Sequence, residues 1–140
     1  MKIYFAAPIT NRISNINLYS RIIKYLSRYG KVLNEKIGDK NFWEKRRKAN
    51  FSKRNAHNFD LKLLLKSDIV VAEISTPSSG VGYEIGRAIE RKKPVLGLYN
   101  KKVEKQLSTM IIGSTDIVSR SYQTFVDIKL AIDKFFNSFL

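Results

Sequence analysis

Apolar residues recur along this 140-residue chain in two alternating spacings. Short, continuous apolar runs predict buried strands, whereas apolar residues at i, i+3, i+4 and i+7 predict amphipathic helices. The expected strands lie at residues 2–7, 31–33, 68–74, 94–99 and, more weakly, 116–120. The expected helices lie at residues 16–29 and 55–66, from the loop at 75–82 to about residue 91, near 102–110, and from about 123 to 139. Residues 34–54 are polar and are expected to be irregular or partly helical.

This alternation predicts the fold class. Strands that alternate with helices pair in parallel through right-handed crossovers. We therefore expect one doubly wound α/β domain over residues 1–140, with a mainly parallel sheet of about five strands. In such folds ligands bind beyond the carboxyl ends of the strands, where the strand order reverses. The loops at residues 7–12 and 75–82 are the expected places for a site.

The loop after the third expected strand has the composition of an anion-binding site. Its hydroxyl groups belong to Ser75, Thr76, Ser78 and Ser79, and its glycines are Gly80 and Gly82. A helix that begins there points unpaired N–H groups at the loop, which suits a phosphate. Helix capping by serine or threonine is the alternative. The glycine spacing does not fit the dinucleotide fingerprint, and no Gly-Lys-Ser/Thr sequence of a P-loop is present.

An acidic residue lies on the inward face of the helix that follows this loop. Glu84 belongs to the same stripe as Val81, Ile85 and Ala88. Burying a carboxylate without a partner costs several kcal/mol, roughly, so Glu84 needs a partner or a function. A position in the first helical turn would favour its ionised form. A structural ion pair is the alternative to a catalytic role.

Asp60 shows the same pattern on the preceding helix. The helical spacing places Asp60 and His57, the single histidine, on the apolar side with Leu61 and Leu64. A histidine in such a position is more often a hydrogen-bonded core residue than a catalyst. Tyr4, in the first strand, is a candidate to donate its hydroxyl into the same space. Two carboxylates beside an anion site suggest glycosidic bond cleavage of a phosphorylated sugar that carries a leaving base.

Charge and composition limit the class of protein. The net charge is +14, from 26 Lys and Arg against 12 Asp and Glu, and residues 43–54 hold six basic residues. Nucleic-acid binding is therefore an alternative function, although a positive field that attracts small anionic substrates is favoured because the basic residues are dispersed. There is no cysteine and no apolar run of the length that crosses a bilayer. Without an export signal, we expect a cytoplasmic protein.

Several segments resemble one family. "KIYFAAPI", "NFDLKLLLKSDIVVAEI" and "PSSGVGYEIGRAI" are similar to the nucleoside 2-deoxyribosyltransferase superfamily. "RYGKVLNE" and "QLSTMIIG" resemble its hydrolytic branch, the 2′-deoxynucleoside 5′-monophosphate N-glycosidases. The resemblance covers nearly the whole chain. It implies a flavodoxin-like fold and cofactor-free, metal-free cleavage of the bond between base and deoxyribose in a small nucleotide.

The resemblance also implies roles for individual residues. Glu84 would be the nucleophile, Asp60 the general acid/base, and Tyr4 the residue that orients Glu84. Ser78 and Gly80 would hold the 5′-phosphate. The active site would be shared within a homodimer, because Ser108 would reach the phosphate bound by the neighbouring subunit.

The first loop departs from the family pattern. A Ser-Ile-Arg type segment that contributes to phosphate binding corresponds here to Pro8, Ile9 and Thr10. Ile9 remains a candidate binding residue, and Arg12 would supply the missing charge. Two alternatives to the hydrolase stay open: a deoxyribosyltransferase that passes the sugar to another base, and a basic nucleic-acid-binding module.

Overall fold

A computed structural model describes residues 1–9 and 12–139, with the side chains of residues 12–14 left undescribed. The elements, in chain order, are β1 (Lys2–Ala6), α1 (Arg12–Leu26), β2 (Lys31–Val32), the 3-10 helix η1 (Glu35–Gly38), α2 (Lys40–Lys48), α3 (Lys53–Lys66), β3 (Ile69–Glu73), α4 (Ser79–Glu90), β4 (Val95–Asn100), the 3-10 helix η2 (Lys101–Gln106), α5 (Thr109–Ile112), β5 (Ile117–Tyr122) and α6 (Phe125–Asn137). No helix in the described ranges is long and apolar enough to cross a membrane.

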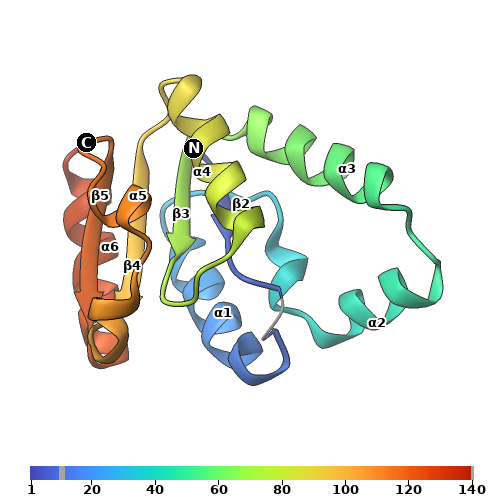
Figure 1. The fold of residues 1–140 in the computed structure, drawn as a ribbon, viewed down its shortest axis with the longest axis horizontal. Coiled ribbons are helices and arrows are strands. Elements are labelled where there is room, and N and C mark those ends of the chain that lie inside the picture. The colour runs from blue at the N-terminus through green and yellow to red at the C-terminus, as the bar shows by residue number, and fades with distance from the viewer. Residues whose placement is uncertain (10–11, 140) are drawn as a thin grey trace.

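The five strands form one parallel sheet in the order β2-β1-β3-β4-β5 (Figure 1). Every neighbouring pair in this sheet is parallel. The doubly wound α/β fold predicted from the alternating pattern is therefore confirmed. The strand order reverses between β1 and β3, so the carboxyl ends of these two strands flank the expected ligand-binding edge.

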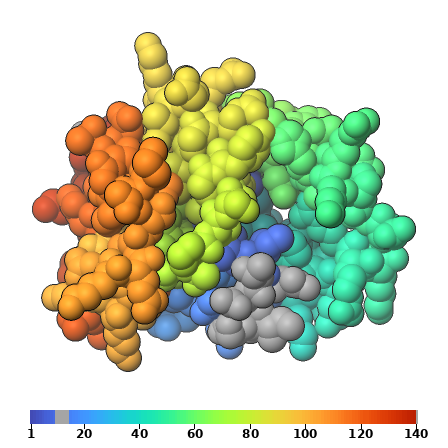
Figure 2. Space-filling view, in the orientation of Figure 1, coloured from blue at the N-terminus to red at the C-terminus, as the bar shows by residue number. Residues whose placement is uncertain are grey.

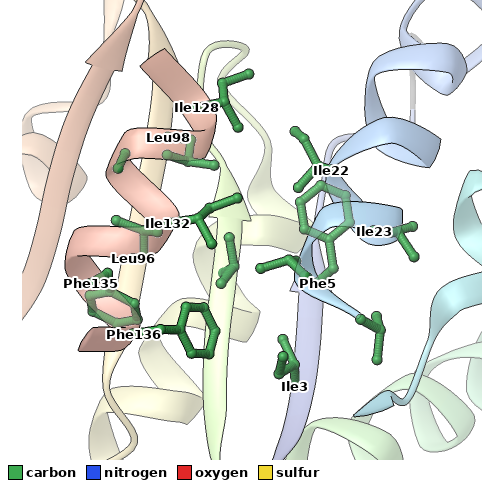
Figure 3. Packing of buried hydrophobic residues seen from close by; sticks show 14 of the residues in the cluster. Ile3, Phe5, Ile22, Ile23, Leu96, Leu98, Ile128, Ile132, Phe135 and Phe136 are labelled. Carbon is green, nitrogen blue, oxygen red and sulfur yellow. The ribbon is translucent and has the colours of Figure 1, made fainter. Parts of the chain in front are cut away.

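Side chains alternate between the two faces of the sheet and build two core layers. Ile3 and Phe5 of β1 pack with α1 and α6, in the layer shown in Figure 3. Tyr4 and Ala6 point to the other face, where they pack with α3 and α4. This alternation decides which helices Tyr4 can reach.

The polar segment between β2 and α3 is partly helical, which was one of the two expectations for it. It forms η1 and α2, and Figure 1 shows that α2 and α3 lie together at the side of the molecule away from α6. The helix predicted near residues 102–110 is instead divided into η2 and the four-residue α5. Polar sequences carry little periodic signal, which explains why these elements were not resolved by pattern alone.

Asn34 extends the short edge strand β2 with its side chain. Its Oδ1 accepts a hydrogen bond of 2.9 Å from the Phe5 amide, and its Nδ2 donates one of 2.6 Å to the Phe5 carbonyl. The side-chain amide thus replaces a strand residue beside β1, which satisfies both backbone groups of Phe5 near the ligand-binding edge.

Candidate active site

Tyr4 and Glu84 meet between the sheet and α4. The Tyr4 hydroxyl donates a hydrogen bond to Oε2 of Glu84. Glu84 lies on the inward stripe of α4, between the buried residues Val81, Ile85 and Ala88. The prediction that the helical spacing turns this carboxylate inward is confirmed, and the Tyr4 hydroxyl is its partner.

Burial controls the protonation of Glu84. Removal from water raises its pKa to about 7, the nearby charge of Asp60 raises it as well, and the hydrogen bond from Tyr4 lowers it. The expectation that a first-turn position would favour the ionised form is not met. Glu84 is the sixth residue of α4, beyond the first turn to which the helix dipole effect is largely confined, so desolvation outweighs it.

Burial likewise raises the pKa of the Tyr4 hydroxyl, and the charge of Glu84 raises it further. Tyr4 is therefore protonated at every physiological pH and acts as a hydrogen-bond donor. A fixed donor of this kind selects one orientation of the Glu84 carboxylate and leaves its other oxygen for chemistry.

Asp60 of α3 belongs to the same electrostatic cluster. Its charge raises the pKa of both Glu84 and Tyr4. Burial raises the pKa of Asp60 itself, while Arg46 of α2 opposes this shift. The Asp60 side chain is 37% exposed, and its Oδ2 lies 3.5 Å from Nη2 of Arg46. The two predicted carboxylates thus come from separate helices, and the charge of Asp60 reaches Glu84. Figure 2 shows a hollow between α4 and the α2–α3 pair.

His57 does not lie on a buried face, contrary to its predicted position. It is exposed, its Nε2 lies 2.9 Å from the Tyr83 hydroxyl, and its Nδ1 lies 2.9 Å from Oδ1 of Asn58. The helical spacing predicted the direction of the side chain correctly, but the residue that His57 meets there, Tyr83 of α4, is itself 45% exposed. His57 links α3 to α4 at the surface.

Ser78 caps the helix that carries Glu84. Its Oγ accepts a hydrogen bond of 3.3 Å from the Val81 amide. A methyl group placed on Gly80 would meet only this Oγ, at 3.8 Å, and one placed on Gly82 would meet nothing within 4 Å. Packing among the described residues therefore does not require either glycine, and with respect to these residues the start of α4 is open to a ligand or a partner.

A cavity of about 450 Å³ lies beside this helix start. Its lining includes Ser78, Ser79 and Gly82 on one side and Leu107 and Ser108 on the other. Ser108 precedes α5 and makes no capping hydrogen bond with its side chain. Ser78 and Ser108, which were both predicted to contact phosphate, thus face one cavity within a single chain.

The loop after β1 is only partly described. Ile9 is 54% exposed at the carboxyl end of β1, and the carbonyl of the preceding Pro8 accepts a 3.1 Å hydrogen bond from the Tyr19 hydroxyl. Thr10 and the side chain of Arg12 lie outside the described residues, so the predicted role of Arg12 remains a prediction.

Glu73 was missed by the sequence analysis. It ends β3 and is 4% exposed. Its carboxylate accepts hydrogen bonds from the Ser75 amide at 2.7 Å and from the Tyr122 hydroxyl at 3.1 Å. The Oγ of Ser75 in turn accepts from the Asn100 amide at 2.7 Å. Glu73 therefore fixes the start of the loop that leads to Ser78, and its signal was an acidic residue within an apolar strand.

The cluster can supply a nucleophile and an acid/base group. Nucleophilic catalysis needs an oriented carboxylate, and acid/base catalysis needs a group that can exchange protons with the substrate and with water. Glu84 is oriented by Tyr4, and Asp60 is partly exposed to a solvent or substrate proton. No group of three or more His, Cys, Asp or Glu side chains that could hold a metal ion is found among the described residues.

Comparison with known proteins identifies the family of the chain. The family model described as "Nucleoside 2-deoxyribosyltransferase" matches residues 3–127. The chain is 41% identical over 114 residues to the 5-hydroxymethyl-dUMP N-hydrolase of Mus musculus. The aligned residues make up 81% of this chain and 66% of the mouse protein. The chain is 35% identical over 140 residues to the protein of the same name from Rattus norvegicus, over 99% of this chain and 86% of the rat protein.

The fold is also shared with a solved structure. The CMP N-glycosidase BcmB of Clostridium botulinum superposes with a TM-score of 0.62 at 18% sequence identity, covering 96% of this chain and 98% of that chain. At this identity the superposition supports the doubly wound architecture alone.

Proposed function

Since the chain belongs to the nucleoside 2-deoxyribosyltransferase family, we propose that it hydrolyses the N-glycosidic bond of 2′-deoxynucleoside 5′-monophosphates, releasing the free base and 2-deoxyribose 5-phosphate. The observation that carries this proposal is the inward carboxylate of Glu84, oriented by Tyr4 and lying within the electrostatic reach of Asp60. The N-hydrolase names of the mouse and rat relatives support the same reaction.

In the first step, one oxygen of Glu84 attacks C1′ of the deoxyribose. The C1′–N bond breaks, its electron pair leaves with the base, and the sugar becomes bound to Glu84 as an ester. Asp60, whose pKa is raised by burial, donates the proton that the departing base takes up. The hydrogen bond from Tyr4 keeps the attacking carboxylate in place.

In the second step, a water molecule attacks C1′ and displaces Glu84. Asp60, now ionised, accepts the proton of this water, and Glu84 returns as a carboxylate. The reaction therefore uses Asp60 first as an acid and then as a base. The partial exposure of Asp60 supports this exchange of protons with substrate and water.

The 5′-phosphate is proposed to lie at the start of α4. Ser78 and Gly80 stand where the unpaired amides and the positive end of the helix dipole meet, and Gly80 leaves open space there. Ile9 and Arg12, at the end of the neighbouring loop, would complete the phosphate site. The net charge of +14 favours an anionic substrate.

We further propose a homodimer in which Ser108 contacts the phosphate bound by the neighbouring subunit. The Ser108 side chain makes no capping hydrogen bond to the helix that follows it. Next to it, Met110 is 83% exposed and Ile112 is 38% exposed. Exposed apolar side chains of this size next to a cavity are typical of an interface.

A product assay tests the proposed function. The wild-type protein is incubated with ribo- and deoxynucleosides, each with and without a 5′-phosphate, and the free base is quantified. Base release from deoxynucleoside monophosphates is expected. Release of no base from any of these compounds would contradict the proposal.

Base exchange is a second candidate function, because the matching family model describes a transferase. Both reactions share the sugar ester on Glu84, and only the acceptor differs. Adding a second free base to the assay separates them: a new nucleotide containing the added base would identify a transferase, and sugar phosphate alone a hydrolase.

A further inference from the structure

The guanidinium of Arg46 is surrounded by aromatic rings where α2 meets α3. Its carbon lies 5.1 Å from the ring centroid of Phe51, 5.7 Å from those of Phe42 and Trp43, and 5.9 Å from that of Phe59. Each of these distances is within the range of a cation–π interaction. The Arg46 side chain is 13% exposed, although it lies in the most basic segment of the chain.

The same guanidinium faces the proposed acid/base residue. Its Nη2 lies 3.5 Å from Oδ2 of Asp60, which is longer than the usual 2.7–2.9 Å, roughly, of a charge-assisted hydrogen bond. This is its one hydrogen bond to the described residues, and a guanidinium carries about five N–H donors. Arg46 therefore has donor capacity beside Asp60 that a bound ligand can use.

Residues of this aromatic group line two cavities. One, of about 270 Å³, is lined by Phe42, Phe51 and Phe59 together with Arg46. The other, of about 160 Å³, is lined by Phe42, Phe59 and Asp60 among others. Phe42 and Phe59 thus border both cavities. Because the guanidinium lies 3.5 Å from Asp60, a planar ring bound beside Asp60 would be within reach of the guanidinium and of the neighbouring aromatic rings.

We propose that Arg46 binds the leaving base, by donating an N–H group to a ring carbonyl oxygen adjacent to the glycosidic nitrogen, and that the enzyme prefers 2-oxopyrimidine nucleotides. This inference rests on the proposed function and names its substrate class. A pyrimidine carries such an oxygen at C2, next to the glycosidic N1. Purines carry no oxygen next to the glycosidic nitrogen, so they cannot form this contact.

The contact would assist bond cleavage. As the C1′–N1 bond breaks, its electron pair stays on the base and spreads over N1, C2 and the C2 oxygen. A donor held at that oxygen stabilises the charge in the transition state more than in the ground state. The base then takes its proton from Asp60. With Arg46 in place, the rate would therefore depend less on how well the base itself stabilises the negative charge that it acquires.

A purely structural role makes a different prediction. If Arg46 only held α2 against α3, its loss would lower the rate for every substrate by the same factor. Arg46→Met keeps most of the apolar stem but removes the charge and the donors, and Arg46→Lys keeps the charge. Arg47→Met is the matched control, because Arg47 is the exposed neighbour on the same helix and the charge change is the same.

The test compares kcat/KM for dUMP, 5-fluoro-dUMP and dAMP, with Tm measured for each variant. Wild type is expected to favour dUMP over dAMP. Arg46→Met is expected to lower kcat/KM by about 10²-fold for dUMP and about 10-fold for 5-fluoro-dUMP, because the fluorine itself stabilises the departing charge. Arg46→Lys should also lose more kcat/KM for dUMP than for 5-fluoro-dUMP, with smaller losses for both. Arg47→Met should have the kcat/KM values of wild type.

Equal losses on all three substrates, or no loss, would overturn the inference while leaving the proposed function intact. If Arg46→Met does not fold, Arg46→Lys decides by the same comparison. Release of no base from any substrate by wild type would instead overturn the proposed function, and this inference with it.

Discussion

Tyr4 and Glu84 are 80 residues apart in the sequence and joined by a hydrogen bond in the fold. Tyr4 is the third residue of β1, and the pleat of the strand turns it toward α4. The same bond that orients Glu84 also lowers its pKa, against a larger shift upward from burial. This one contact therefore affects both the geometry and the protonation of the proposed nucleophile.

Replacing Tyr4 is expected to change the pH dependence of the reaction. In Tyr4→Phe, loss of the donated hydrogen bond raises the pKa of Glu84, so the rise of kcat/KM with pH should move to higher pH. A hydrogen bond to a charged group contributes about 1.5–3 kcal/mol, so kcat/KM should fall by about 10- to 100-fold. The pH–rate profile measures both effects.

Tyr29→Phe is the matched control for this substitution. Tyr29 also donates to a carboxylate, that of Asp133 in α6, on the opposite side of the sheet. Its loss should lower Tm but leave the pH–rate profile in place. A Tyr4→Phe profile that superposes on that of wild type would show that Tyr4 does not act on the nucleophile.

Glu84 should reduce stability at neutral and alkaline pH. Its folded-state pKa of about 7 lies above its ordinary value of 4.5. Between these values the folded state binds more protons than the unfolded state, so stability falls as pH rises through this window. Glu84→Gln removes the effect and should raise Tm at pH 8 by several degrees, roughly, but much less at pH 4.5.

Glu90→Gln serves as the control for this measurement. Glu90 is exposed near the end of the same helix, so water surrounds it in both states. Its substitution should change Tm little at either pH. A Glu84→Gln protein that is no more stable than wild type at pH 8 would mean that the buried charge carries no cost.

The phosphate site is tested by separating binding from helix capping. Ser78→Ala removes a cap and the proposed phosphate contact, so it should lower Tm and also reduce the preference for a monophosphate over its nucleoside by about 10-fold. Ser52→Ala removes an equivalent cap, on α3. It should lower Tm by a similar amount but leave the preference unchanged. If the two variants prefer the monophosphate over its nucleoside to the same extent, the phosphate is bound elsewhere.

The shared active site is tested by mixing two inactive variants. If Ser108 acts on the neighbouring subunit's substrate, Glu84→Gln and Ser108→Ala subunits combine into dimers with one intact site. Half of the dimers in a reassociated mixture are mixed, and each of these has one intact site out of two. The mixture should therefore recover about a quarter of the wild-type activity. No recovery, despite exchange of subunits confirmed by native mass spectrometry, would assign Ser108 to the site of its own chain.

The parts of the site that the sequence predicted depend on local periodicity. The 3.6-residue repeat was enough to turn Glu84 inward, because its neighbours on α4 are apolar on one side only. Its pairing with Tyr4 depends on how β1 aligns with β3, where Tyr4 lies opposite Val70. That register is a long-range property, so the partner of Glu84 was named from a family resemblance and not from spacing.

The parts that were missed depend on tertiary structure. Four aromatic residues between Phe42 and Phe59 show no common period, and only the turn between α2 and α3 gathers them around Arg46. The error at His57 has a similar cause. A helical pattern gives the direction of a side chain but not whether another layer lies there to cover it.

The most direct test of the central claim is the rate at which Glu84→Gln releases base from a deoxynucleoside monophosphate. Wild type and variant are compared at saturating substrate and pH 8, where wild-type Glu84 is mostly ionised. Base release by wild type is expected, with a fall of at least about 10³-fold in a folded Glu84→Gln protein, because no other described group replaces the nucleophile. Release by the variant within about 10-fold of wild type would contradict the central claim.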